Sequence, residues 1–228
     1  MNRRTLAIVG AASVALAIAL VVASLVSGSG DPGQTPSPTV SGSAGIAGLA
    51  QDGAFLGSPD APYVLVEYAD LQCPYCGQYA TEIMPTIIDR YVRTDKLRLE
   101  FRGLAFLGPD STSGLRIVEA AAAQDKLWNV LEALFAEQGK ENGGWMPGAV
   151  DGLGDAVPGF DLAAARTAAD SGAVTAAIAT SNRLAGEDGV RGTPSFTIRP
   201  KGGTATPLEV KALDVASFES ALESALAG

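Results

Sequence analysis

Residues 63–92 read YVLVEYADLQCPYCGQYATEIMPTIIDRYV, an apolar run followed by two cysteines and a helical pattern. The first seven residues are rich in β-branched and aromatic side chains, which predicts a buried strand. After Cys73, Pro74 suits the first turn of a helix, and apolar residues recur at helical spacing to the end of the stretch. Pro85 is expected to kink this helix rather than end it, because the apolar spacing continues beyond it.

The two cysteines lie where the predicted strand meets the predicted helix. A cysteine at a helix N-terminus faces unpaired backbone N–H groups and the positive end of the helix dipole, and both stabilise a thiolate. Cys73 has that position, whereas Cys76 lies one turn further in on the same helical face. We therefore expect Cys73 to be the attacked or attacking sulfur, and the more buried Cys76 to resolve the mixed disulfide.

The residue counts exclude several kinds of site. With two cysteines and no histidine, the chain alone cannot build a Cys-His dyad, a Ser-His-Asp triad or a four-ligand zinc site of Cys and His. A structural disulfide is disfavoured, because closing so short a loop removes little entropy from the unfolded chain. We expect no metal, and no cofactor other than a redox-active disulfide between Cys73 and Cys76. The net charge of −9 argues against a nucleic-acid partner.

The beginning of the chain reads as an export segment followed by a linker. Arg3 and Arg4 precede an uncharged apolar run, residues 6–26, which is long enough for a helix across a hydrocarbon core of about 30 Å. Because positive flanks stay in the cytoplasm, residues 1–26 predict a signal anchor with the rest of the chain outside. A cleaved signal peptide is the alternative, since small residues follow the run. Residues 27–51, rich in Gly, Ser, Pro and Thr, predict a flexible linker.

The remainder, residues 52–228, has the length of one domain. Residues 96–101 alternate polar and apolar side chains, which predicts a second strand, and residues 195–198 and 208–211 predict a late hairpin. Between them, apolar residues recur at helical spacing; Trp128 and Phe135 belong to this pattern and are expected in the core. A terminal helix is expected from Val215.

Three blocks of the sequence resemble the DsbA-like branch of the thioredoxin superfamily. They are GSPDAPY at residues 57–63, EYADLQCPYC at 67–76 and VRGTPSF at 190–196. Their order and spacing span nearly all of residues 54–228. The resemblance implies an α/β thioredoxin-like fold with an α-helical subdomain inserted at about residues 108–187, here preceded by the signal-anchor helix.

The resemblance also implies roles for the matched residues. Thr193 and Pro194 match a loop that ends in a cis-proline facing the disulfide, where the residue before the proline pairs with an incoming peptide. On the sequence alone, a trans-proline at a strand entry is the alternative. Glu67 matches a buried acid that moves protons for the second cysteine, and a lone buried carboxylate needs such a use or a partner. Asp70, at the strand end, is expected to be a solvated turn residue.

The motif departs from the best-known oxidases of this branch at Tyr75. Those proteins carry a histidine there, which helps to stabilise the thiolate of the first cysteine. Pro74 followed by Tyr75 is the dipeptide familiar from glutaredoxins. The resemblance therefore implies a less extreme oxidant, with a reduction potential between thioredoxin's, about −270 mV, and that of the strongest oxidase, about −120 mV.

The activity that the resemblance implies is thiol-disulfide exchange outside the cytoplasm, with Cys73 and Cys76 introducing disulfides into exported proteins. The expected partners are substrate thiols and a membrane quinone-linked reoxidase, DsbB-like or VKOR-like, and the protein is expected to be a monomer anchored through residues 6–26. A reductase or isomerase fed by a membrane electron donor is the first alternative. A redox-inert peptide-binding module is the second, against which the intact CPYC motif and the Thr193-Pro194 pair argue.

Overall fold

A computed structural model describes residues 45–227 of the chain. The predicted signal anchor and most of the predicted linker lie outside these residues. Within the described part of the chain, no helix is both long enough and apolar enough to cross a membrane.

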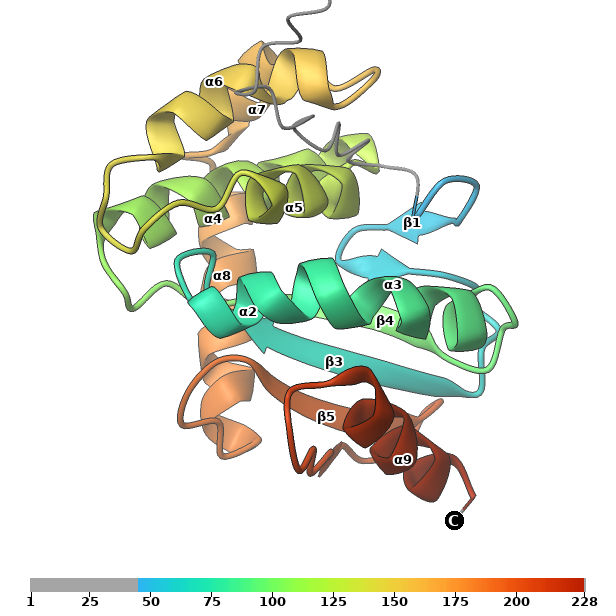
Figure 1. The fold of residues 1–228 in the computed structure, drawn as a ribbon. Coiled ribbons are helices and arrows are strands. Elements are labelled where there is room, and N and C mark those ends of the chain that lie inside the picture. The colour runs from blue at the N-terminus through green and yellow to red at the C-terminus, as the bar shows by residue number, and fades with distance from the viewer. Residues whose placement is uncertain (1–44, 228) are drawn as a thin grey trace, which may run out of the picture. The chain divides into compact units, whose positions relative to one another are not determined.

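A six-stranded mixed sheet lies at the centre of the domain, in the order β1-β2-β4-β3-β5-β6 (Figure 1). Its strands are β1 (Gln51–Asp52), β2 (Phe55–Leu56), β3 (Tyr63–Ala69), β4 (Arg98–Gly103), β5 (Ser195–Pro200) and β6 (Thr206–Pro207). The predicted first strand is confirmed as β3, which pairs in parallel with β4 and antiparallel with β5. Nearly all residues of β3 are apolar because helices cover both faces of the sheet, so that side chains on either face are buried.

Two other predicted strands are shifted along the chain. The second strand begins at Arg98 instead of residue 96. The second strand of the late hairpin is Thr206–Pro207, not residues 208–211. Leu208 directly follows this strand, is buried, and donates its N–H to the carbonyl of Phe196 at 2.9 Å.

The helix after Cys73 runs to Val92 but changes its winding along the way. It consists of α2 (Pro74–Gln78), the π-helical turn η1 (Tyr79–Ile83), α3 (Met84–Ile87) and the π-helical turn η2 (Ile88–Val92). Pro85 does not end it, as predicted. A proline cannot donate to the carbonyl four residues earlier, and the wider turn η1, which ends two residues before Pro85, accommodates this loss.

Five α-helices separate β4 from β5 in the chain. They are α4 (Pro109–Ala121), α5 (Leu127–Ala136), α6 (Met146–Ala156), α7 (Leu162–Ala168) and α8 (Gly172–Glu187), with a 3-10 turn η3 (Ala122–Gln124) after α4. These helices fill the place of the predicted insertion. In Figure 1, α4 and α5 lie beside α2, while α8 passes behind the sheet, on the face opposite α2 and α3. Trp128 and Phe135 are buried in the core, which confirms the prediction for both.

The terminal helix α9 (Val215–Leu226) covers β5 on the same side as α2 and α3 (Figure 1). Phe218 of this helix stacks against Tyr79 and Phe196, with ring centroids 5.1 and 4.8 Å away. The three rings fasten α9 and β5 to the helix that carries the cysteines.

The predicted linker extends too far toward the domain. Ile46 is only 2% exposed and belongs to the core. Arg93 donates hydrogen bonds to the carbonyls of Gly45 and Ala47 at 2.6 and 3.0 Å, and β1 already begins at Gln51. The folded part therefore includes residues 45–51, which are held by the buried Ile46, by the hydrogen bonds of Arg93 and by the start of β1.

Candidate active site

Cys73 and Cys76 lie at the N-terminus of α2, as the sequence predicts. Cys73 is the N-cap residue, and its carbonyl accepts hydrogen bonds from the N–H groups of Cys76 and Gly77 at 3.0 and 3.1 Å. Both cysteines are free thiols here, with Cys73 5% exposed and Cys76 fully buried. An incoming sulfur therefore reaches Cys73 before Cys76.

The Cys73 thiol is acidic. Its pKa is lowered to about 6, and the largest cause is the hydrogen bond with the Cys76 side chain. The Thr193 side chain and the N–H groups of Cys76 and Tyr75 lower it further, while desolvation by burial acts in the opposite direction. Such donors stabilise the thiolate. At neutral pH, Cys73 is therefore mostly ionised and nucleophilic.

The pKa of the Cys76 thiol is shifted in the opposite direction. Burial raises the pKa of Cys76 far above the usual value, and the neighbouring Cys73 and Glu67 raise it further. Desolvation disfavours the charged form, so Cys76 holds its proton until a base takes it. The two sulfurs thus have the unequal acidities that the sequence predicts.

The segment around Pro194 lies opposite the first cysteine. The Thr193–Pro194 peptide bond is cis, as the resemblance implies, and the trans alternative is wrong. In its thiol form, the Sγ atom of Cys73 donates to the carbonyl of Thr193 at 3.2 Å, although the two residues are 120 positions apart in the chain. Thr193 therefore contacts the first sulfur through its carbonyl, and its side chain contributes to the lowered pKa of Cys73.

Replacing Thr193 by valine should raise the pKa of Cys73, because valine keeps the shape but lacks the hydroxyl that stabilises the thiolate. A hydrogen bond of about 0.5–1.5 kcal/mol corresponds to a rise of up to about one pKa unit. Thiolate absorbance against pH measures it, with Thr193→Ser, which keeps a hydroxyl, as the control. Equal pKa values in both variants would show that the hydroxyl does not act on Cys73.

Glu67 lies on β3 close to the buried thiol. Its carboxyl group is 3% exposed, and Oε1 has no hydrogen-bond partner among the described residues. Burial raises the pKa of this carboxyl to about 8. The hydroxyl of Tyr79 is buried and unpartnered in the same part of the structure, and its pKa is raised by burial and by the charge of Glu67. Glu67 thus has the burial and the raised pKa of a group that exchanges protons near pH 7.

The raised pKa of Glu67 should make the reduced protein less stable as pH rises from about 4.5 to about 8. In this range the unfolded chain has lost the proton that the folded protein keeps, so the free energy of unfolding decreases with pH. In the wild-type protein, Glu67 should make the free energy of unfolding fall by about 1.4 kcal/mol per pH unit, and Glu67→Gln should abolish this fall. Denaturant unfolding at several pH values measures this, with the exposed Glu82→Gln as the control.

Turnover of the Glu67→Gln variant should be slower and have a changed pH profile, while the first attack at Cys73 stays largely intact. The charge of the carboxyl group acts on the Cys76 thiol and is not among the causes that shift the pKa of Cys73. A variant with full activity and an unchanged profile would remove Glu67 from the mechanism.

Asp70 was predicted to be a solvated turn residue, and this prediction is wrong. The side chain is fully buried. Its Oδ1 accepts from Gln72 N and Ser111 Oγ at 2.9 and 2.5 Å, and its Oδ2 accepts from the N–H groups of Phe106 and Leu107 at 2.9 and 3.1 Å. Asp70 therefore fastens the segment before Cys73 to α4 and to the loop that precedes it.

Gln138 is a second residue that the sequence did not indicate. Its Nε2 donates to the carbonyls of Leu71 and Cys73 at 2.7 and 3.0 Å, from just beyond the end of α5. A Cβ atom on Gly77 would lie 2.1 Å from Oε1 of Gln138, so the glycine leaves room for this amide. The helical insertion thus holds the backbone of the first cysteine. The glycine directly after the CPYC motif was the one hint in the sequence.

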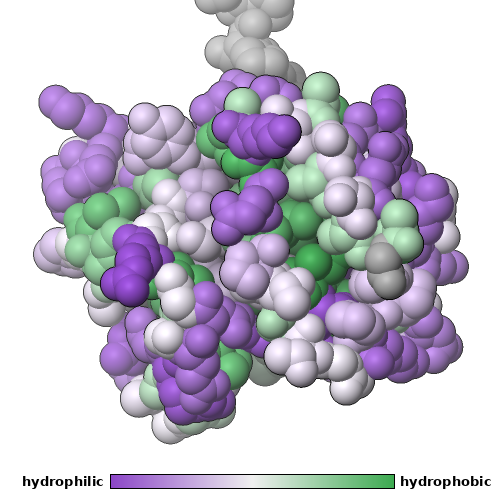
Figure 2. Space-filling view, turned by 90° about the horizontal axis from the view of Figure 1, so that it is seen from below, coloured by the Kyte–Doolittle hydropathy of each residue, from purple (hydrophilic) through white to green (hydrophobic). Residues whose placement is uncertain are grey.

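A groove opens along the segment that carries Thr193 and Pro194. It has a volume of about 530 Å³, and its walls include Tyr75, Pro194, Phe196 and Leu208. Tyr75 is 63% exposed, which leaves its ring free to contact another molecule. The face seen from below is shown in Figure 2, where hydrophobic residues are visible in the middle and at the left, interspersed with hydrophilic ones.

The sheet order, the N-capping cysteine of a CPYC motif and the cis-proline opposite it define a thioredoxin-fold protein with a dithiol site and an inserted helical layer. A family model described as Thioredoxin matches residues 50–214. The chain belongs to this thioredoxin family, and its relatives are of the DsbA-like kind.

The curated relatives include a probable disulfide bond formation protein D of Bacillus cereus, 32% identical over 93 residues, which are 40% of this chain and 43% of that protein. The chain thus spans less than half the length of the curated relatives that it matches. Oxidised BdbD of Bacillus subtilis has a similar structure, with a TM-score of 0.65 at 21% identity, over 79% of this chain and 98% of that one. A thioredoxin-like oxidoreductase of Silicibacter pomeroyi has a TM-score of 0.61 at 28% identity, over 76% and 92%.

Proposed function

We propose that this protein is a thiol-disulfide oxidoreductase that works outside the cytoplasm and introduces disulfides into exported proteins through Cys73 and Cys76. The observation that carries the proposal is the contrast between the two sulfurs, one acidic and reachable, the other buried and protonated. A redox-inert binding module would not need this contrast. The relatives that are named disulfide bond formation proteins support the same activity.

In the proposed reaction, the protein starts with a disulfide between Cys73 and Cys76. A substrate thiolate attacks the Sγ atom of Cys73, the bond between the two cysteines breaks, and Cys76 leaves and takes up a proton. A second substrate thiolate then attacks the substrate sulfur of the mixed disulfide and releases Cys73 as a thiolate. The substrate is oxidised by two electrons and the protein is reduced by the same two.

The acidity of Cys73 favours the oxidising direction. A stabilised thiolate stabilises the reduced protein, which makes its disulfide a stronger oxidant. Tyr75 adds no positive charge, so the reduction potential should lie between about −270 mV and about −120 mV. The groove beside Tyr75 and Pro194 offers apolar surface along which an unfolded substrate could lie.

The cellular setting of this proposal depends on the sequence and the relatives. Residues 1–26 would anchor a monomer in the membrane, with residues 27–44 as the tether. A quinone-linked membrane protein, DsbB-like or VKOR-like, would accept the two electrons from Cys73 and Cys76. The disulfide would be the sole redox group of the site.

The redox state of the two cysteines in living cells tests the direction. Cells are quenched with acid, free thiols are alkylated with a reagent that adds mass, and the oxidised fraction is read from a gel. A mostly oxidised pair that becomes reduced when reduced substrates are in excess supports an oxidase. A pair that stays reduced would overturn the oxidase and favour a reductase or isomerase.

A further inference from the structure

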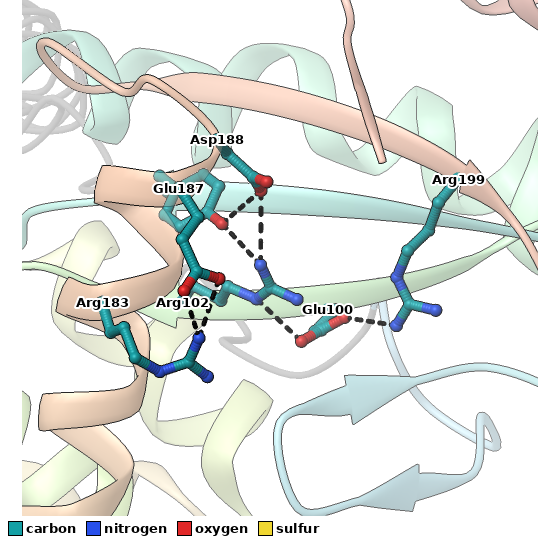
Figure 3. A network of polar contacts seen from close by, with 7 residues as sticks. Glu100, Arg102, Arg183, Glu187, Asp188 and Arg199 are labelled. Carbon is teal, nitrogen blue, oxygen red and sulfur yellow. Dashed lines mark hydrogen bonds and ion pairs between the residues drawn. The ribbon is translucent and has the colours of Figure 1, made fainter. Parts of the chain in front are cut away.

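Figure 3 shows a network of polar side chains that includes Glu100, Arg102 and Asp188. It lies on the face of β3 to which Tyr68 points, opposite the face of Glu67. Successive residues of a strand point to opposite faces, so Tyr68 projects away from the cysteines and toward α8. Its hydroxyl donates to Oδ2 of Asp188 at 2.6 Å and accepts from Nη1 of Arg102 at 2.5 Å. The same Nη1 lies 3.4 Å from Oδ2 of Asp188, so the three side chains form a closed set.

The network continues across the sheet through paired charges. Glu100 accepts from Arg102 at 2.8 Å and from Arg199 at 2.9 Å. Tyr68, Arg102 and Glu100 are buried. A buried ion pair adds little net stability, because desolvation offsets most of the attraction, but it fixes which groups lie together. The main effect of the network is therefore to fix the positions of the segments that it joins.

The geometry that it fixes is that of the segment leading to Pro194. Asp188 follows the last residue of α8, and only residues 189–192 separate it from Thr193. Beyond Pro194, Ser195 is the partner of Tyr68 in the pairing of β5 with β3. Tyr68 thus holds this segment at both ends, with its hydroxyl at Asp188 and with its backbone at Ser195.

Val190, in the middle of the segment between Asp188 and Ser195, is also held in place. Val190 packs against the cluster that Tyr68 forms with Val64, Val66, Leu104 and Ala185, and its N–H donates to the carbonyl of Ala185 at 2.9 Å. This leaves residues 191–194 to reach across to the Sγ atom of Cys73.

We propose that Tyr68, Arg102 and Asp188 are positioning residues for disulfide exchange, which fix residues 188–195 so that Thr193 meets the first sulfur. The inference rests on the proposed function, because it concerns the site where exchange would occur. None of the three touches either cysteine; their effect passes through Thr193. Tyr68 and Glu67 thus lie on opposite faces of β3. Tyr68 acts on Cys73 through Thr193, and Glu67 acts on Cys76.

Asp188→Asn tests the inference, with Glu187→Gln as the matched control. Glu187 precedes Asp188 directly, carries the same charge and pairs with Arg183 in solvent (Figure 3). Asp188→Asn should raise the pKa of Cys73 by up to about one unit, the change expected of Thr193→Val. The disulfide should become correspondingly less oxidising at equilibrium with glutathione. Glu187→Gln should change neither value.

The direction of the change separates positioning from direct charge. Removing a carboxylate makes the electrostatic potential at Cys73 more positive, which by itself lowers the pKa of Cys73. A rise therefore points to the loss of a group that stabilises the thiolate, and among these groups the Thr193 side chain is the one that lies in the held segment. Tyr68→Phe removes one hydroxyl without altering charge and should also raise the pKa of Cys73. Combined with Asp188→Asn it should add little, because both act on one contact.

A pKa of Cys73 that is unchanged or lower in both variants would overturn the inference, even if their melting temperatures fall. These pKa measurements need no substrate. An oxidase assay that fails in the wild-type protein would therefore overturn the proposed function and leave the positioning result standing.

Discussion

Replacing Cys76 by serine is expected to leave substrate proteins covalently attached to Cys73. The Cys73 thiolate, whose pKa is lowered, attacks a disulfide of an oxidised substrate protein, forms the mixed disulfide and releases the other substrate sulfur as a thiolate. Without Cys76, no thiol of the protein can displace the substrate. Nonreducing electrophoresis of the purified variant should show adducts that vanish on reduction, and mass spectrometry should place every linkage at Cys73.

Cys73→Ser is the control for this experiment. It should capture no substrate and have no exchange activity, because the buried, protonated Cys76 is a poor nucleophile and an inaccessible target. Adducts on Cys76 in this variant, as abundant as those on Cys73 in the other, would contradict the assigned roles of the two sulfurs.

Asp70→Ala should lower the free energy of unfolding by about 3 kcal/mol or more, since it leaves several buried donors without an acceptor. The Ser111 hydroxyl and the N–H groups of Phe106 and Leu107 all donate to this carboxylate. Alanine fills less volume and accepts nothing, and water has little access to these groups. Denaturant unfolding monitored by tryptophan fluorescence measures the loss.

Asp60→Ala is the matched control for this experiment, at the other end of the same strand. Asp60 is exposed and forms a surface ion pair with Lys201 at 3.1 Å. Its loss should change the stability by less than about 1 kcal/mol. If Asp70→Ala proved as mild as Asp60→Ala, the hydrogen bonds of Asp70 could not be what holds the segment before Cys73.

The sequence predicted best those elements that are determined by residues close together in the chain. The strand at residues 63–69 and the helix start at Cys73 follow from apolar spacing and a proline within one short stretch. The resemblance added the cis bond at Pro194 and the burial of Glu67, because the matching blocks carry them.

Asp70 shows why the rest could not be predicted. Next to a strand end, an aspartate is usually solvated, and nothing in its neighbours distinguishes the two cases. Its partners Phe106 and Ser111 lie 36 and 41 positions away. The same holds for Gln138 and for the link between Tyr68 and Asp188, because side-chain hydrogen bonds between distant segments leave no periodicity in the sequence.

The contact between Cys73 and Thr193 also has a consequence for synthesis of the chain. The ribosome makes Cys73 first and must add 120 more residues before Thr193 exists. At roughly 5–20 residues per second, this takes about 6–24 s. During that interval the growing chain already carries both cysteines but lacks the threonine that helps to make one of them acidic. Each newly made molecule thus passes through a period in which its thiols have not yet acquired the reactivity of the finished protein.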